Sequence, residues 1–162
     1  MTERILADNQ VVGAYTVQSL IKRSQYNESY CVTNSVNETY FLKIYDLKNV
    51  PSNILNADSI ITEIDYCEKL THHNIISFVE KGVYVLEGEN YPYLVTKFIH
   101  GCMIADPLSK GRMFTLDMTI GIVKNALKGL SYMHSKGLCH NDITPRNIIY
   151  NYKNLGETSL ID

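Results

Sequence analysis

The sequence lacks the features that would direct a protein to nucleic acid or to a membrane. Fifteen basic residues against seventeen acidic ones give a net charge of -2 without a dense basic cluster, which nucleic acid or an anionic membrane surface would favour. No stretch approaches the ~18 apolar residues of a spanning helix, and the first ten residues carry charges where a signal peptide needs an apolar run. These absences predict a soluble, cytoplasmic protein without nucleic-acid or membrane partners.

Closely spaced cysteines and internal repeats are also missing. The four cysteines lie far apart and form no Cys-x-x-Cys pair, so neither a zinc site nor a redox motif is predicted. No repeat or low-complexity tract divides the 162 residues, which suffice for one ordinary hydrophobic core. We therefore expect a single globular unit.

The first half of the chain has the composition of β-strands. Segments rich in β-branched and aromatic residues alternate with polar turns, which is typical of antiparallel hairpins. Five strands are predicted, at residues 16–21, 29–32, 39–45, 83–86 and 93–98.

Two segments have the apolar spacing of helices. Between the third and fourth predicted strands, Ile61, Ile64 and Cys67 recur three residues apart, and Asp58 or Ser59 could cap the helix start. A longer pattern runs from Leu116 through Ile120, Val123, Leu127 and Leu130 to Met133 or His134 and predicts a helix of about five turns that ends near Gly137. The order of elements indicates an α+β protein.

Six short fragments follow one another in an order that is itself informative. They are YFLK (40–43), TEI (62–64), HHNII (72–76), YLVTKFIHG (93–101), HNDITPRN (140–147) and SLID (159–162). In this order and spacing they resemble the V-A-I-K lysine, the helix glutamate, the H-P-N-I segment, the hinge, the H-R-D-x-x-x-x-N loop and the D-F-G aspartate of the protein kinase superfamily. The resemblance covers residues 12 to 162.

The resemblance implies a fold. Residues 12–99 would form a kinase N-lobe, with a five-stranded antiparallel sheet and one helix, and residues 100–162 would form the first part of a mainly helical C-lobe. The whole of residues 1–162 is then a partial protein kinase domain.

The resemblance also implies roles for five polar residues in phosphoryl transfer from ATP. Lys43 would contact the α and β phosphates, and Glu63 would hold Lys43 in an ion pair. Asp142 would orient the acceptor hydroxyl, and Asn147 and Asp162 would bind Mg2+.

The remaining implied contacts surround the nucleotide. Thr96 occupies the gatekeeper position. The other expected nucleotide-binding positions are Ile21, Ser24 and Asn27 before and within the phosphate loop, and the hinge backbone of Lys97, Phe98 and Ile99.

Two departures from the family pattern affect the nucleotide. Lys22, Ser24 and Asn27 stand where the loop G-x-G-x-x-G has glycines, and of these only Asn27 readily adopts positive φ, so the grip on phosphate should be weaker or different. Phe41 replaces the alanine of V-A-I-K and would narrow the adenine pocket unless its ring turns into the core of the lobe.

Two further departures lie in the catalytic loop. Asn141 replaces the arginine of H-R-D, which argues against control through a phosphorylated activation loop. Thr144 stands where Ser/Thr kinases carry a lysine near the transferred phosphate, so one positive charge is missing, and Arg146 is the nearest substitute.

In the family, an activation segment and an acceptor-binding surface follow the D-F-G aspartate, and this sequence stops there. We therefore expect a fragment that is inactive alone. The helix from Leu116 would lose part of its packing and expose an apolar face, which favours self-association.

Three functions stay open from the sequence. The first is an ATP- and Mg2+-dependent phosphotransferase acting on Ser or Thr of a protein substrate. The second, favoured by the missing glycines, Phe41 and Thr144, is a pseudokinase or nucleotide-binding scaffold. The third is a small-molecule phosphotransferase of the same fold, because such enzymes also often lack the H-R-D arginine.

Overall fold

The chain is organised in two compact units, each with its own sheet and core. The computed structural model describes residues 4–161, apart from the side chains of residues 155 and 156. Within that range the first unit comprises residues 4–68 and 78–98, and the second comprises residues 69–77 and 99–161. No helix among the described residues is long and apolar enough to cross a lipid bilayer.

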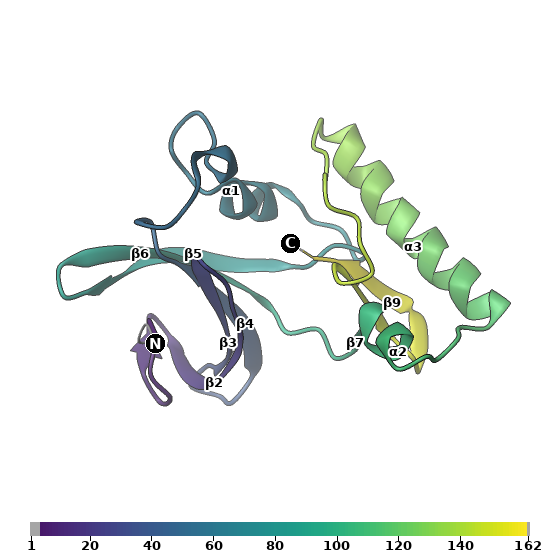
Figure 1. The fold of residues 1–162 in the computed structure, drawn as a ribbon, viewed down its shortest axis with the longest axis horizontal. Coiled ribbons are helices and arrows are strands. Elements are labelled where there is room, and N and C mark those ends of the chain that lie inside the picture. The colour runs from purple at the N-terminus through teal and green to yellow at the C-terminus, as the bar shows by residue number, and fades with distance from the viewer. Residues whose placement is uncertain (1–3, 162) are drawn as a thin grey trace. The chain divides into compact units, whose positions relative to one another are not determined.

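The first unit is built on one antiparallel sheet with strand order β1-β2-β3-β4-β6-β5 (Figure 1). Its strands are β1 (Val11–Val12), β2 (Tyr15–Arg23), β3 (Asn27–Thr33), β4 (Thr39–Tyr45), β5 (Phe78–Leu86) and β6 (Glu89–Lys97). The five predicted strands are confirmed, and the two-residue β1 adds a short edge strand that pairs with β2.

The alternation of side chains along β4 separates the two faces of this sheet. Leu42 and Ile44 are fully buried in the core of the unit. Phe41, Lys43 and Tyr45 therefore point to the opposite face, because successive residues of a strand face opposite ways. The buried core residues are Leu6, Val12, Tyr15, Val17, Tyr30, Val32, Leu42, Ile44, Tyr93 and Val95.

The segment before β1 contributes to this core, which the sequence analysis did not predict. Leu6 is completely buried, and its backbone N–H donates to the hydroxyl of Tyr30 at 3.1 Å. The N–H of Ile5 donates to Oε2 of the buried Glu28 at 2.9 Å. Burial and the hydrogen bond to Glu28 raise the pKa of Tyr30.

The helix of the first unit, α1 (Thr62–Lys69), is shorter than predicted and begins later. Neither Asp58 nor Ser59 caps it, so that prediction is wrong. Ser59 has a φ of 60°, and Asn56 Oδ1 accepts the backbone N–H groups of Asp58 and Ile60 at 3.0 Å each. The side chain of Asn56 thus shapes a turn in front of the helix, and a 3-10 turn, Ser52–Ile54, precedes it.

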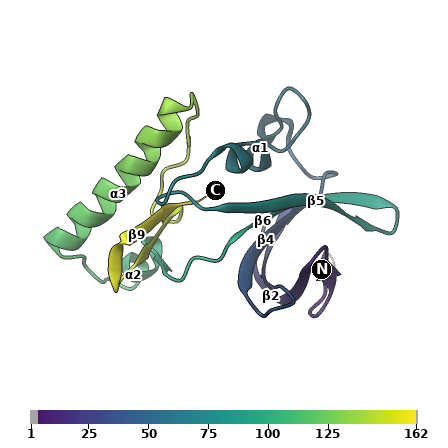
Figure 2. The same cartoon turned by 180° about the vertical axis from the view of Figure 1, so that it is seen from behind.

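The second unit contains two helices and a small antiparallel sheet of order β7-β8-β9. Its elements are β7 (Cys102–Met103), α2 (Ala105–Ser109), α3 (Leu116–Ser135), β8 (Ile148–Asn151) and β9 (Asn154–Leu160). The segment 69–77 joins this unit through Asn74, whose carbonyl accepts the N–H of Leu160 and whose Nδ2 donates to the carbonyl of Thr158. Both views show α3 running along β9 (Figures 1 and 2).

The long helix α3 has the predicted bounds. Thr115 caps its start by accepting the N–H of Met118, and Gly137, with a φ of 74°, lies just beyond its end. Its buried side is formed by Ile122, Ala126, Gly129 and Met133. A Cβ at Gly129 would lie 2.9 Å from the carbonyl oxygen of Asn74, so the helix packs this closely only with glycine there.

The apolar stripe that predicted α3 is mostly not its buried face. Leu116, Ile120, Val123 and Leu127 are between 49% and 74% exposed. The expected exposure of an apolar face on this helix is therefore present.

Candidate nucleotide-binding and catalytic site

A lysine and a glutamate of the first unit meet on the sheet face opposite its core. Lys43 Nζ donates to both carboxylate oxygens of Glu63, at 2.7 and 2.9 Å, so the expected ion pair is present. The side chains are only 9% and 23% exposed. A third residue, which the sequence analysis missed, joins them: the hydroxyl of Tyr45 donates to Glu63 Oε2 at 2.6 Å.

The expected adenine-binding positions lie in different environments. Thr96 is the cross-strand partner of Phe41 and is 2% exposed, and its hydroxyl oxygen has no hydrogen-bond partner among the described residues. Ile21 lies in a register irregularity of β2 and is 45% exposed.

The hinge residues fall at the end of the first unit and the start of the second. Lys97 is the last residue of β6 and is exposed. Phe98 and Ile99, which follow it, are half-buried.

Phe41 does not turn into the core of its unit. It is half-buried and shares the Lys43 face of β4. The ring was expected either to narrow the adenine pocket or to turn into the core. In the structure it lies on the sheet face assigned to the nucleotide.

We expect Phe41→Ala to strengthen Mg-ATP binding by about fivefold to tenfold, because it opens space beside Lys43. It should also lower the free energy of unfolding by about 1–3 kcal/mol, since half-buried aromatic area is lost. Titration calorimetry and urea unfolding of the same samples measure both. Phe41→Leu is the matched control and should give a smaller change of each kind; weaker binding by Phe41→Ala would show that adenine uses the ring as a contact.

The turn between β2 and β3 is closed by a side chain. The N–H of Ser24 donates to the carbonyl of Asn27 at 2.8 Å, and Ser24 Oγ accepts the N–H of Asn27 at 3.1 Å and that of Tyr26 at 3.4 Å. None of the described residues 22–27 has a positive φ, Asn27 included. The serine therefore occupies backbone amides that a glycine loop would offer to phosphate.

Ser24→Gly is expected to strengthen ATP binding several-fold, because it frees the amides of Tyr26 and Asn27. Thr16→Gly, at a half-buried position on the preceding strand β2, controls for the added backbone flexibility of a glycine. Fluorescence titration with a labelled ATP analogue compares the variants. Unchanged affinity in Ser24→Gly would show that these amides do not contact the nucleotide.

The loop between α3 and β8 brings Asp142 and Asn147 together in the second unit. Asn147 Nδ2 donates to Asp142 Oδ2 at 2.7 Å and to its backbone carbonyl at 3.0 Å. The backbone of Asn147 is held as well, since its N–H donates to the carbonyl of Thr144 and its carbonyl accepts the N–H of Ile161. Asp142 is exposed, whereas Asn147 is 8% exposed.

The donor set of this loop suits a hard cation. With Nδ2 directed to Asp142, Asn147 has Oδ1 left as its ligating atom, and Mg2+ prefers oxygen. No group of three or more His, Cys, Asp or Glu side chains capable of holding a metal occurs among residues 4–161 as described. A cation bound here would therefore need further oxygen ligands, which water or phosphate can supply. Asp162, the other expected ligand, lies outside the described residues.

The substituted positions of the loop are exposed or half-buried. Asn141 is exposed and has a φ of 62°, which asparagine tolerates better than most residues. Thr144 is half-buried, and Arg146 is exposed. No salt bridge of Arg146 is found among the described residues.

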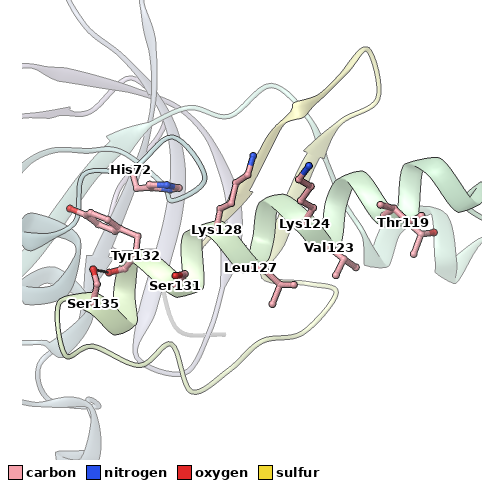
Figure 3. Close-up of a pocket in the computed structure, with 10 residues that line it drawn as sticks. His72, Thr119, Val123, Lys124, Leu127, Lys128, Ser131, Tyr132 and Ser135 are labelled. Atoms are coloured by element: carbon pink, nitrogen blue, oxygen red, sulfur yellow. Dashed lines mark hydrogen bonds between the residues drawn. The ribbon is translucent and has the colours of Figure 1, made fainter.

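A separate groove of about 970 Å3 runs along α3 (Figure 3). Val123 and Leu127 point to one side of the helix and Lys124 and Lys128 to the other. His72 lies across from Tyr132, with their rings stacked at 5.1 Å, and burial, His73 and Lys128 lower its pKa. The residues that line the groove include none of those assigned to nucleotide, metal or catalysis.

Comparison with known proteins decides the family. Residues 16–162 match the family described as protein kinase domain. The chain belongs to the protein kinase domain family. It is similar to the probable serine/threonine-protein kinase fhkC of Dictyostelium discoideum, with 31% identity over 118 residues, which is 73% of this chain and 19% of that protein.

Two further protein kinases are also similar to this chain. Calcium-dependent protein kinase 4 of Plasmodium falciparum is 31% identical over 116 residues, 71% of this chain and 21% of that protein. The crystal structure of the PknI kinase domain of M. tuberculosis superimposes with a TM-score of 0.73 at 20% identity, covering 97% of this chain and 61% of the other. The likeness to PknI shows the kinase fold. The chain thus spans about a fifth of these two relatives and under two thirds of the solved domain.

The structure brings four of the five predicted polar residues together in two pairs, one in each unit. Lys43 and Glu63 meet in the first unit, and Asp142 and Asn147 meet in the second. Two contributions were missed: Tyr45, two residues beyond the lysine on the same strand face, and the turn-closing role of Ser24.

Proposed function

We propose that the protein containing this chain transfers the γ-phosphoryl group of Mg-ATP to a hydroxyl of a protein. The observation that carries the proposal is the ion pair of Lys43 and Glu63, both largely buried. A buried ion pair contributes little net stability, because the desolvation of its two charges offsets their attraction. A lysine held in this way is better explained by an anionic ligand, and phosphate is the ligand that the family membership supports.

The proposed role of each residue follows from the chemistry of its side chain. Lys43 binds phosphate oxygens, and Glu63 orients it. Asp142 accepts the hydrogen bond of the acceptor hydroxyl, while Asn147, together with Asp162, binds Mg2+ through oxygen atoms. The metal ion, when bound, neutralises negative charge on the phosphates.

The acceptor is proposed to be a Ser or Thr side chain of a protein, because the relatives are named as serine/threonine-protein kinases. We propose a cytoplasmic location for the enzyme. Acceptor binding is proposed to need residues beyond this stretch, so residues 1–162 should bind nucleotide without transferring phosphate. The exposed stripe of Leu116, Ile120, Val123 and Leu127 supports self-association of the isolated chain.

A second candidate is a pseudokinase that binds nucleotide weakly or not at all. The specific observations in its favour are the occupied amides of the Ser24 turn and the position of Phe41 beside Lys43. Both features oppose tight ATP binding, and neither removes a residue that acts on the transferred phosphate.

Thermal unfolding with and without nucleotide tests the proposal. ATP with Mg2+ at about 100 times its Kd should stabilise the chain by about 2.7 kcal/mol and raise Tm by roughly 5–10 °C. ATP with EDTA should give a clearly smaller rise in Tm, because EDTA removes the Mg2+ ion that would join the phosphates to Asn147. Equal Tm values with and without Mg-ATP, at nucleotide concentrations up to about 10 mM, would argue for the pseudokinase.

A further inference from the structure

Tyr45 occupies an unusual place beside the ion pair. It is 1% exposed and belongs to neither apolar cluster of the described residues. Its hydroxyl donates to Glu63 Oε2, the oxygen that also accepts the shorter bond from Lys43, and the Lys43 ammonium lies 5.9 Å from the centroid of its ring. One carboxylate oxygen is thus shared by two donors that come from positions i and i+2 of β4.

The helix that carries Glu63 has a small buried face. Only Ile64 and Cys67 of its eight residues are buried. Another polar link from the helix to the sheet is the ion pair of Glu68 with Lys81 of β5, in which both side chains are 43% exposed. Exposed ion pairs of this kind contribute little. The contacts of Glu63 with Lys43 and Tyr45 are therefore among those that hold α1 against the sheet.

We infer that Tyr45 is a positioning residue, which holds Glu63 and with it α1 in place for the Lys43 ion pair. The inference rests on the proposed function for its relation to nucleotide. Lys43 has to share its ammonium between Glu63 and phosphate when ATP binds. The Tyr45 hydroxyl keeps Glu63 Oε2 hydrogen-bonded while that happens, so the helix does not depend on Lys43 alone.

The hydrogen bond from Tyr45 to Glu63 also affects how strongly the carboxylate attracts Lys43. A hydroxyl that donates to Glu63 satisfies part of the hydrogen-bonding capacity of the carboxylate and weakens its hold on Lys43. More of the ammonium charge is then available to the phosphates. The Tyr45 hydroxyl thus favours nucleotide binding both by position and by charge.

Hydrogen exchange of the α1 amides in Tyr45→Phe tests directly whether the Tyr45–Glu63 hydrogen bond holds α1, because the measurement needs no nucleotide. The substitution keeps the ring and deletes the bond to Glu63. Exchange of the amides of α1 should become about tenfold faster, which corresponds to about 1.4 kcal/mol, while amides of β3 keep their rates. The Kd for Mg-ATP should rise about threefold to tenfold.

Tyr40→Phe is the matched control. Tyr40 lies on the same strand and donates to a carboxylate, Glu38 Oε2, at 2.9 Å, away from α1. Its substitution should leave both α1 exchange and nucleotide affinity unchanged. In a Glu63→Ala background, Tyr45→Phe should add nothing to the exchange of α1, because the residue through which Tyr45 acts is absent.

The possible results separate the inference from the proposed function. Unchanged α1 exchange in Tyr45→Phe, or equal acceleration of α1 and β3, would overturn the inference. So would faster α1 exchange with an unchanged Kd for Mg-ATP, since Tyr45 would then not position the site. No Mg-ATP binding by the unsubstituted chain, together with faster α1 exchange in the variant, would overturn the proposed function. The role of Tyr45 in holding Glu63 and α1 would still be supported.

Discussion

Lys43→Met is expected to weaken Mg-ATP binding by about 10-fold to 100-fold, the equivalent of about 1.4–2.7 kcal/mol. Methionine approximates the length of the lysine stem and removes the charge, so the phosphates lose a charge-assisted contact. The same substitution should lower the free energy of unfolding by about 2–3 kcal/mol, because it leaves the carboxylate of Glu63 largely buried with Tyr45 as its remaining described donor. Titration calorimetry and urea unfolding measure the two effects.

Two further variants separate charge from packing. Lys81→Met deletes an exposed ion pair on the same sheet and should change unfolding by less than about 1 kcal/mol without affecting nucleotide. Glu63→Gln in the Lys43→Met background should recover part of the lost stability, since the unpaired carboxylate is removed, but none of the lost affinity. Full Mg-ATP affinity in Lys43→Met would disprove the role of Lys43.

Asp142→Asn is expected to reduce phosphoryl transfer by about 10^2-fold to 10^4-fold, the usual range for the loss of a group that handles the transferred proton. The change should be in kcat, with the Kd for Mg-ATP within about twofold of the original. An amide at position 142 can still accept the bond from Asn147 Nδ2 through its oxygen, so the loop geometry should persist while the charge is lost.

This comparison is made in a protein that contains residues 1–162 and transfers phosphate, with transfer followed by incorporation of labelled phosphate into a generic protein substrate. Asp117→Asn, at an exposed carboxylate in the first turn of α3, is the matched control and should leave kcat unchanged. Undiminished turnover in Asp142→Asn would contradict the assignment of Asp142.

The parts of the site that the sequence predicted are those fixed by motif spacing. The resemblance of YFLK and TEI to the lysine and glutamate motifs of the protein kinase family implied the ion pair of Lys43 and Glu63, and the structure contains it. Tyr45 could have been suspected from strand alternation, since it shares the face of Lys43, but its bond to Glu63 depends on the exact placement of α1. The start of α1 was also predicted wrongly, because Asn56 Oδ1 forms a turn before the helix where the sequence suggested a cap at Asp58 or Ser59.

The buried face of α3 shows a limit of predicting burial from hydrophobic periodicity. Hydrophobicity marks Ile120, Val123 and Leu127, and those positions are exposed. The buried face includes Ala126 and Gly129, whose small size lets the helix approach Asn74 and β9 but gives almost no hydrophobic signal. Periodicity therefore predicted the helix, and the expected exposure of its apolar face is present, but it did not mark Ala126 and Gly129 as buried, because a close backbone approach selects for small side chains.

Chemical labelling shows directly whether Lys43 lies at the phosphates of bound ATP. An ATP analogue with an acyl group on its terminal phosphate transfers that group to a lysine amine held near the phosphates, with release of ATP, and mass spectrometry identifies the lysine. If Lys43 binds the phosphates, it should be labelled preferentially in the presence of Mg2+, and excess Mg-ATP should abolish that labelling by competition. Labelling spread over exposed lysines outside the site, such as Lys110 and Lys124, with no protection by Mg-ATP, would contradict this role of Lys43.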